Sequence, residues 1–287
     1  MPNHLIDGLT SPTLKHLREQ WWDDVFTSFL KETLRPRPGN RILDVGCGTG
    51  TGEVSIGRLH LSQIELFGID LLVDHTRAAR DATAGINQRA HFAAADAVHL
   101  PFRDGVFDST YCVAVLQHVV DVGAAIHEFA RVTRGGGRIV AVEPDNAARY
   151  WYSSAKAGRL AFETATRFFA ALAKARGDGA DPSIGPRLPS LFSEAGIEPV
   201  SVRLFPVSQA RLGVPAASVW QSRRARVQQW IEQASDAATR AVGREYLEAL
   251  RAYEAEAGEA GQTFVEIENT MLFATVGQVG EKPAGRR

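Results

Sequence analysis

The sequence is poor in cysteine and nearly free of net charge. Its 287 residues include only two cysteines, Cys47 and Cys112, and the formal net charge is −1. Two thiols cannot build a disulfide framework, and a crosslink at Cys47 would distort the glycine-rich stretch around it. We therefore expect a reducing, cytoplasmic setting. The near-zero charge excludes a global positive field that would attract nucleic acid or an anionic membrane.

Long apolar runs are also missing. No uninterrupted stretch approaches the roughly 18 residues that a membrane span requires. The N-terminus, MPNHLIDGLTSP, lacks the basic and apolar regions of a signal peptide. With 45% hydrophobic and 23% charged residues, the composition is that of a soluble globular protein with a large core. We expect a soluble, unprocessed protein with no membrane partner, and the sequence leaves its oligomeric state open.

Short apolar runs alternate with helical segments in the first half of the chain. Buried parallel strands have this pattern, and their alternation with helices predicts a doubly wound α/β fold with a mostly parallel sheet. The five runs are residues 42–45, 64–69, 91–95, 107–116 and 138–142.

The second half of the chain has a different order. A helical segment over 150–190 is followed by two strand-like runs, 198–207 and 264–276, and the residues between these runs have helical periodicity. An insertion therefore separates the two strands of one hairpin. We divide the chain into an N-terminal helical cap (1–38), a core (39–207 and 263–277, including the segment 150–190), a helical lid (208–262) and a flexible tail (278–287).

The stretch RILDVGCGTGTGE, residues 41–53, places a glycine-rich turn after an apolar run. Dinucleotide-binding folds need glycines at the first, third and sixth positions of such a turn. Counted from Gly46 the sixth position is Thr51, and counted from Gly48 it is Glu53. Both registers fail, which argues against NAD.

The sequence LDVGCGTG instead has an acid followed by glycines at every second position, and it closely resembles the first motif of the class I S-adenosylmethionine-dependent methyltransferases. The resemblance implies S-adenosyl-L-methionine as cofactor. This cofactor has no phosphate, and bare glycines let the main chain approach its methionine and ribose portions. By the resemblance, Asp44 supports the turn or reaches the ammonium group of the ligand. The expected contacts from the turn are Asp44, Gly46, Cys47, Gly48 and Gly50. A helix-capping turn without a ligand is the alternative.

Two further acids follow at the distances that the family predicts. Asp70 ends the run LFGID, where a carboxylate accepts both ribose hydroxyls, and Leu71 would lie against the adenine ring. Taken alone, Asp70 also fits a helix N-cap. In AADAVHLPF, the resemblance implies that Asp96 meets the adenine amino group and that the backbone NH of Ala97 meets a ring nitrogen.

The blocks FDSTYCVAVLQHV and RVTRGGGRIV complete a resemblance that covers about residues 41–143. The family has a seven-stranded sheet in which strand seven is antiparallel and lies between strands five and six. The resemblance therefore implies that the runs 198–207 and 264–276 form this hairpin.

Methyl transfer requires an in-line arrangement of nucleophile, methyl carbon and sulfur, and a base only where the acceptor must lose a proton. His118 follows the fourth run and is our leading candidate base; the alternative is a role in the cofactor pocket, where Val113 is also expected. Glu143 ends the fifth run and is the second candidate base. Its alternative is a turn residue before Pro144.

Other branches of the family lack support in the sequence. EPDN resembles the Asp–Asn pair of metal-dependent relatives, but the further carboxylate after the fourth strand is missing, so we predict no metal. The motifs of adenine-amino and cytosine-C5 methyltransferases are absent, and QSRRARVQQW is more typical of a solvated face than of a nucleic-acid site. We expect a small-molecule substrate and no nucleic-acid partner. A non-catalytic cofactor-binding module and an enzyme of other chemistry are the competing interpretations.

Overall fold

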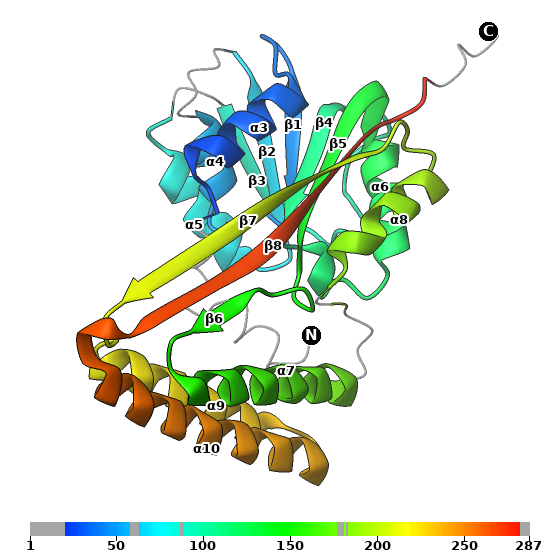
Figure 1. Ribbon diagram of the computed structural model, residues 1–287. Helices are drawn as coiled ribbons and strands as arrows, with labels where there is room; N and C mark the ends of the chain where they lie inside the picture. Colours follow the sequence, from blue (N-terminus) through cyan, green and yellow to red (C-terminus); the bar gives the residue numbers. More distant parts are fainter. Residues whose placement is uncertain (1–20, 58–62, 87–88, 177–180, 182, 282–287) are drawn as a thin grey trace, which may run out of the picture.

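The computed structural model describes residues 21–57, 63–86, 89–176, 181 and 183–281. An eight-stranded sheet forms its centre (Figure 1), in the order β3-β2-β1-β4-β5-β8-β6, with β7 pairing on β8. Strands β1 to β5 are parallel, and β8 is antiparallel to its neighbours. The strands are β1 (Arg41–Val45), β2 (Glu65–Asp70), β3 (Arg89–Ala94), β4 (Phe107–Val113), β5 (Thr133–Asp145), β6 (Trp151–Ser153), β7 (Ser201–Leu212) and β8 (Val265–Gln278).

The predicted α/β fold with a mostly parallel sheet is confirmed. The five predicted runs supply β1 to β5, and β8 lies between β5 and β7 as the resemblance implied. Two details differ. The stretch around Tyr150, expected to be helical, contains β6, and the hairpin is longer than its apolar runs indicate because β7 continues to Leu212.

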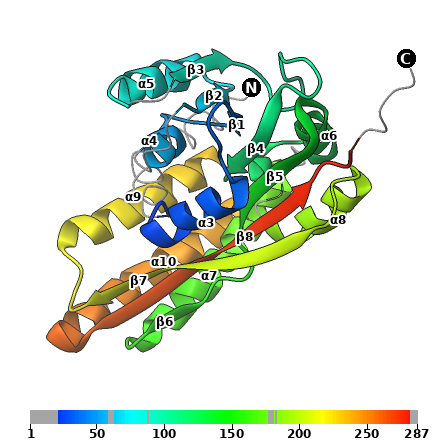
Figure 2. The same cartoon turned by 90° about the horizontal axis from the view of Figure 1, so that it is seen from above.

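Helices cover both faces of the sheet. Figure 2 shows α3 (Asp24–Leu34), α4 (Thr51–Gly57) and α5 (Val73–Thr83) on one side, and α6 (Val122–Val132) and α8 (Leu188–Glu194) on the other. Helix α6 begins where the Asp121 carboxylate accepts the Ala124 N–H at 2.8 Å. Its buried residues Ile126 and Phe129 face β4 and β5, and burying each such side chain contributes about 1.5–3 kcal/mol.

Helix α3 is the described part of the predicted N-terminal cap, of which residues 1–20 lie outside the described residues. The Asp23 carboxylate caps it by accepting the Phe26 N–H at 2.7 Å. Phe26, Leu30 and Leu34 recur at helical spacing and pack on the sheet together with Phe205 of β7. This helix therefore belongs to a layer over the face of the sheet.

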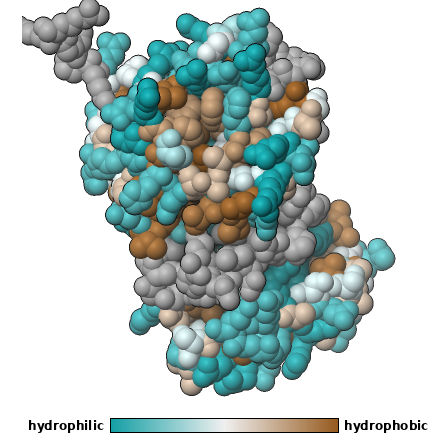
Figure 3. All heavy atoms as spheres, turned by 180° about the vertical axis from the view of Figure 1, so that it is seen from behind, coloured by the Kyte–Doolittle hydropathy of each residue, from teal (hydrophilic) through white to brown (hydrophobic). Residues whose placement is uncertain are grey.

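Three helices form a separate cluster, here called the helical unit: α7 (Lys156–Arg176), α9 (Ala217–Gln233) and α10 (Ala237–Ala260). They pack around Phe168, Trp220 and Ile231 and lie beyond the carboxyl ends of the parallel strands (Figure 1). The unit thus combines the predicted segment 150–190 with the predicted insertion. In Figure 3 the part of its outer surface seen from behind is mostly hydrophilic. Within the described part of the chain, no helix is long and apolar enough to cross a membrane.

The last strand extends closer to the C-terminus than predicted. Gln278, which the sequence assigned to the flexible tail, is the last residue of β8, and Val279 is buried and forms a bridge with Ile197. The apolar side chain of Val279 explains the difference, because it packs against the core on the α6 side. Residues 282–287 of the predicted tail lie outside the described residues.

Candidate cofactor site

The glycine turn, residues 46–50, connects β1 to α4 in a backbone conformation that side chains disfavour. Gly46, Gly48 and Gly50 have φ values of +76°, +53° and +86°. The N–H groups of Gly46 and Cys47 both donate to the Ile69 carbonyl, at 2.7 and 2.8 Å. A Cβ on Gly46 would lie 2.3 Å from Cγ2 of Val115. The turn is therefore packed tightly between β2 and the loop that follows β4.

Gly48 differs from its neighbours because it faces open space. No described atom lies within 4 Å of the position that its Cβ would occupy. Its N–H donates to Oδ2 of Asp70 at 3.0 Å. The turn thus exposes bare backbone next to a carboxylate, which is the surface that a ligand with hydroxyl groups requires.

Asp70 ends β2 and is held by several donors. Its Oδ1 accepts the Leu72 N–H at 2.9 Å and lies 3.2 Å from Nδ1 of His75. Burial opposes ionisation of Asp70, but the hydrogen bonds from His75, Leu72 and Gly48 outweigh it, so the pKa of this carboxyl lies below its ordinary value. Asp70 is therefore an ionised acceptor at neutral pH.

The residues assigned to the adenine end follow neighbouring strands. Asp70 pairs with Ala94 in the register of β2 and β3, so Leu71 and Asp96 extend from the same edge of the sheet. Leu71 is 42% exposed and Asp96 is also exposed, whereas Ala97 is buried. The Asp96 carboxylate accepts the Val98 N–H at 3.1 Å. An exposed apolar side chain and a carboxylate side by side suit a flat polar ring.

Below the turn lies a pair of buried acids, of which only Asp44 was predicted to have a role in the site. Asp44 is 5% exposed, and Glu53, on α4, is 1% exposed. Burial raises the pKa of Asp44 to about 7; the hydroxyl of Tyr111 lowers it in part, and the charge of Asp70 raises it. Burial, together with Asp44, also raises the pKa of Glu53. Among the described residues, neither oxygen of Glu53 has a hydrogen-bond partner.

Glu53 was missed because it counted only as a position that breaks the dinucleotide pattern. Its place in the first turn of the helix after the glycine turn could have drawn attention to it. That place alone predicts an exposed acid that stabilises the helix through its dipole, not a buried one. Here the side chain points inward instead: a Cβ on Gly68 of β2 would lie 2.5 Å from Oε1 of Glu53.

Both cysteines are buried and free. Burial, together with Glu53 and Asp44, raises the pKa of the Cys47 thiol, and its Sγ donates to the Gly48 carbonyl at 3.7 Å. Cys47 therefore enters the site as a neutral thiol, and its contribution to the turn is its backbone.

The loop after β4 is held by Glu143. This carboxylate is fully buried; Oε1 accepts the N–H groups of Val115 and Leu116, both at 2.7 Å, and Oε2 accepts that of Gln117 at 3.3 Å. The loop continues as the 3-10 helix η1 (Leu116–His118), so its last residue, the half-buried His118, is positioned through Glu143. Val113, at the end of β4, is also half-buried.

The structure thus brings the predicted residues to one edge of the sheet. Asp44 pairs with Gly68 and with Tyr111, and Val113 pairs with Val142, so the carboxyl ends of β1, β2, β4 and β5 are level. This edge is where open α/β sheets bind ligands. Asp145, at the end of β5, is engaged locally because its Oδ1 accepts the Ala147 N–H at 2.9 Å. In the described ranges no three His, Cys, Asp or Glu residues are grouped as a metal site would require.

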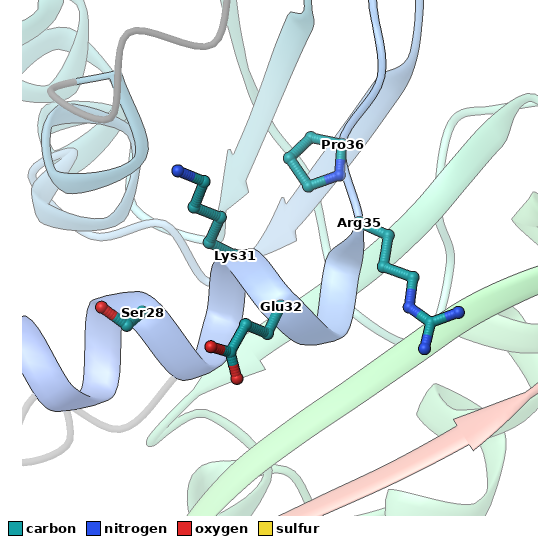
Figure 4. Close-up of a pocket in the computed structure, with 5 residues that line it drawn as sticks. All are labelled: Ser28, Lys31, Glu32, Arg35 and Pro36. Carbon is teal, nitrogen blue, oxygen red and sulfur yellow. The ribbon is translucent and has the colours of Figure 1, made fainter.

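A separate hollow of about 410 Å³ lies beside α3 (Figure 4). It is lined by Ser28, Lys31, Glu32, Arg35 and Pro36, all from α3 and the turn after it. None of these residues belongs to the glycine turn or to the strand ends around it. The hollow is therefore distinct from the candidate cofactor site.

Comparison with known proteins agrees with this geometry. The methyltransferase domain family matches residues 43–141, which include the glycine turn, Asp70, Asp96 and the loop that ends at His118. The arrangement of strands and helices is that of the class I methyltransferases, as the sequence predicted.

The chain is similar to an O-methyltransferase of Pyrenophora dematioidea, with 37% identity over 37% of this chain and 40% of that protein. It is also similar to the 27-O-demethylrifamycin SV methyltransferase of Amycolatopsis mediterranei, with 32% identity over 47% of this chain and 52% of that protein. The matches thus span about half the length, or less, of these curated relatives. The crystal structure of a putative methyltransferase from Bacillus halodurans has the same fold. The TM-score is 0.53 at 15% identity, over 88% of this chain and 97% of that one.

Proposed function

We propose that this protein is an S-adenosylmethionine-dependent methyltransferase that acts on a small-molecule acceptor. The observation that carries the proposal is the backbone of Gly48: among the described residues, nothing beyond its chain neighbours lies within 4 Å of its Cβ position, and its N–H donates to the ionised carboxylate of Asp70. The names of the relatives, an O-methyltransferase and a methyltransferase of a rifamycin, support a small acceptor. A net charge of −1 is consistent with an acceptor other than nucleic acid, and two buried free thiols favour a cytoplasmic setting.

Each end of the cofactor has residues that fit it. The glycine turn would lie against the methionine and ribose portions, and Asp70 would accept the ribose hydroxyls. Leu71 would cover the adenine ring, while Asp96 and the N–H of Ala97 would bind its polar edge. The buried pair of Asp44 and Glu53 would face the ammonium group, a cation that favours the charged form of a nearby carboxyl. When bound, the cofactor supplies a methyl group on a sulfonium sulfur.

The protein's own contribution to the reaction is positioning, with His118 as the group that takes a proton where the acceptor is a hydroxyl. An imidazole is suited to that role because a neutral ring has one nitrogen that can accept a proton. Glu143 acts through the loop: its hydrogen bonds to three successive backbone N–H groups fix the position of His118. We assign it as a positioning residue because its carboxylate is fully buried and occupied by these donors.

We propose that the helical unit covers the part of the site where the acceptor binds. It lies beyond the edge that carries Asp70 and His118 (Figure 1). The aromatic side chains of the segment RYWYSS, residues 149–154, lie in two different environments. Trp151 stacks on Phe162 within the unit, with ring centroids 5.2 Å apart, whereas Tyr150 and Tyr152 are 56% and 46% exposed. The two tyrosines are therefore the aromatic side chains of this segment that can contact a ligand.

The test is turnover with methyl-labelled cofactor and a panel of small hydroxyl, amine and carboxylate acceptors, followed by mass spectrometry of the products. We expect an acceptor that gains the labelled methyl group, together with S-adenosylhomocysteine. Tight cofactor binding without labelled product for any acceptor would favour a non-catalytic module. A product changed in structure without the label would show a different chemistry, and either result would overturn the proposal.

A further inference from the structure

The buried acids Asp44 and Glu53 belong to a polar cluster between helix α4 and the sheet. Asp44 of β1 pairs with Gly68 of β2 on one side and with Tyr111 of β4 on the other. Residues paired in register on parallel strands point to the same face of the sheet. Helix α4 covers this row with its buried residues Gly52 and Glu53, so the acid from the helix meets the acid from the strand.

The positions of these side chains follow from two glycines. A Cβ on Gly52 would lie 2.6 Å from the Tyr111 hydroxyl oxygen and 2.7 Å from Oδ2 of Asp44. Oε1 of Glu53 lies 2.5 Å from the Cβ position of Gly68, the residue that pairs with Asp44. Adjacent strands are about 4.7–4.9 Å apart. The carboxyl groups of Asp44 and Glu53 are therefore neighbours under the same helix.

Glu53 is the member of the cluster that lacks a partner. Its side chain is 1% exposed, and neither Oε1 nor Oε2 has a hydrogen-bond partner among the described residues. Buried polar atoms in native proteins normally have such partners, and a carboxyl without any calls for an explanation. A ligand that brings a positive charge to the cluster supplies one.

The surroundings of the pair hold other acids and neutral rings. The titratable groups near it are Tyr111 and Cys112 of β4, Cys47 of the turn and Asp70 of β2. The rings of Trp22 and Phe92, which carry no charge, lie against Gly52 and Gly68. Within the described ranges, no lysine, arginine or histidine forms an ion pair with either acid of the pair.

Two neighbouring carboxyl groups without a counter-charge do not both ionise readily, because like charges repel at short distance. Burial raises the pKa of Asp44 to about 7, and burial together with the charge of Asp44 raises the pKa of Glu53. The pair as a whole therefore keeps at least one proton at neutral pH in the free protein. A cation beside the pair would favour the loss of that proton.

The pair adjoins the candidate cofactor site. Asp44 is separated from Gly46 of the glycine turn by one residue, and Gly68 precedes Asp70 by two residues on β2. The proposed function places the ammonium group of the cofactor at Asp44. Glu53 lies behind Asp44, and the ammonium group would act on both acids.

We propose that Glu53 is a second acid of the cofactor site, which loses its proton to solvent when the ammonium group of the cofactor binds at Asp44. The pair then carries more negative charge opposite the ammonium group, so the site selects ligands that have this group over ligands that lack it. Glu53 acts through Asp44 and determines specificity. The proposal rests on the proposed function, since it takes the ammonium group to be that of S-adenosylmethionine.

The test compares S-adenosylhomocysteine with its deamino analogue, in which a hydrogen atom replaces the amino group. Each ligand is titrated into the full chain by calorimetry between pH 6 and 8.5, in two buffers of different ionisation enthalpy. The difference between the buffers gives the number of protons released per ligand bound. We expect wild type to release protons with S-adenosylhomocysteine and none with the analogue, and to bind the analogue about tenfold or more weakly through loss of a charged hydrogen bond.

The pH separates the two acids. Asp44 has largely lost its proton above pH 7 in the free protein, so protons released at pH 8 come from Glu53. We expect release at pH 8 from wild type and none from Glu53→Gln, which should also discriminate less between the two ligands. Glu163→Gln is the matched control, because Glu163 of α7 is exposed and pairs with Arg159, and we expect it to release protons as wild type does.

A second measurement does not depend on the folding of variants. NMR of the wild-type chain with ¹³C-labelled glutamate carboxyl groups shows which of them are protonated. We expect one glutamate carboxyl to keep its proton at pH 8 in the free protein and to ionise when S-adenosylhomocysteine is added. Absence of such a carboxyl, equal proton release with the deamino analogue, or unchanged release in Glu53→Gln would overturn the proposal.

The same titrations separate this proposal from the proposed function. Binding of S-adenosylhomocysteine without proton release at pH 8 would overturn only the role of Glu53. A chain that binds neither ligand would overturn the proposed function and the role of Glu53 together.

Discussion

At the scale of single residues, the site depends on side chains whose charge is controlled by burial. Asp44 and Asp70 illustrate the two outcomes. Asp70 receives enough hydrogen bonds to lower its pKa, whereas burial raises the pKa of Asp44 to about 7. Two acids of the same candidate site therefore differ in charge at neutral pH in the free protein. The difference makes the two positions separable by experiment.

The raised pKa of Asp44 predicts a pH-dependent stability of the free protein. In the folded state this carboxyl keeps its proton until about pH 7, but in the unfolded chain it loses the proton near its ordinary pKa of about 3.9. The stabilisation is therefore complete below about pH 4 and is lost as the pH rises through 7. Urea unfolding of wild type and Asp44→Asn between pH 5 and 8 checks this: we expect the decline to be weaker in the variant. Equal slopes would assign the decline to other groups.

Glu143 gives a second prediction at this scale. Glu143→Ala leaves the buried N–H of Leu116 and the partly buried N–H groups of Val115 and Gln117 without their acceptor, and an unpaired donor costs about 1–3 kcal/mol where it is buried. We expect a loss of about 3 kcal/mol or more in the free energy of unfolding. Glu143→Gln keeps one oxygen that can accept from Val115 and Leu116, so it should lose clearly less. Urea unfolding measures both, and equal stability of the two variants would contradict the role of Glu143 in the loop.

At the scale of elements, the helical unit depends on a close approach of three helices at Gly243. A Cβ at this position of α10 would lie 2.5 Å from Ile231 of α9 and 2.7 Å from Phe168 of α7. We expect Gly243→Ala to destabilise the protein by about 1–3 kcal/mol, because the packed helices must separate.

Gly258 is the matched control in the same helix. No described atom lies within 4 Å of its Cβ position, so Gly258→Ala should stabilise the protein by up to about 1 kcal/mol through higher helix propensity. Both variants replace glycine by alanine in the same helix, so the difference between their thermal unfolding temperatures measures the packing clash at Gly243. A Gly243→Ala variant as stable as Gly258→Ala would mean that the three helices are not packed as described.

The elements also show what the sequence could predict. The glycine turn follows β1, Asp70 ends β2, and Asp96 comes two residues after β3, so local patterns located them. Local patterns did not reveal β6, because three residues carry no periodicity, nor the inward direction of Glu53. The joining of α7 to α9 and α10 depends on contacts between segments distant in the sequence, such as Phe168 with Gly243, and no periodicity encodes such contacts.

The site itself divides in the same way. The cofactor half was predictable because its residues lie at strand ends whose order the fold dictates. The proposed acceptor half was not, since the helical unit is held over this edge by contacts between distant segments, such as that of Arg223 on α9 with Glu266 on β8. The pattern QSRRARVQQW predicted a solvated face for the arginines of α9, but Arg223 donates to the buried carboxylate of Glu266.

At the scale of the whole molecule, we assign cofactor binding to the sheet and the covering of the acceptor to the helical unit. Strand ends β1 to β4 supply the proposed cofactor contacts, and the hairpin β7–β8 connects the sheet to the three helices that cover the same edge (Figure 1). Binding and covering thus reside in different layers of the fold. The central claim of this account concerns the first layer, namely that the glycine turn selects S-adenosylmethionine.

Calorimetric titration of the full chain with S-adenosylhomocysteine and, separately, with NAD tests that claim most directly. We predict binding of S-adenosylhomocysteine and none of NAD. Asp70→Ala should weaken the binding by about 1–3 kcal/mol through lost charged hydrogen bonds, while Asp74→Ala, an exposed acid that pairs with Arg77 on α5, should leave it unchanged. Binding of NAD without any response to S-adenosylhomocysteine would contradict the account.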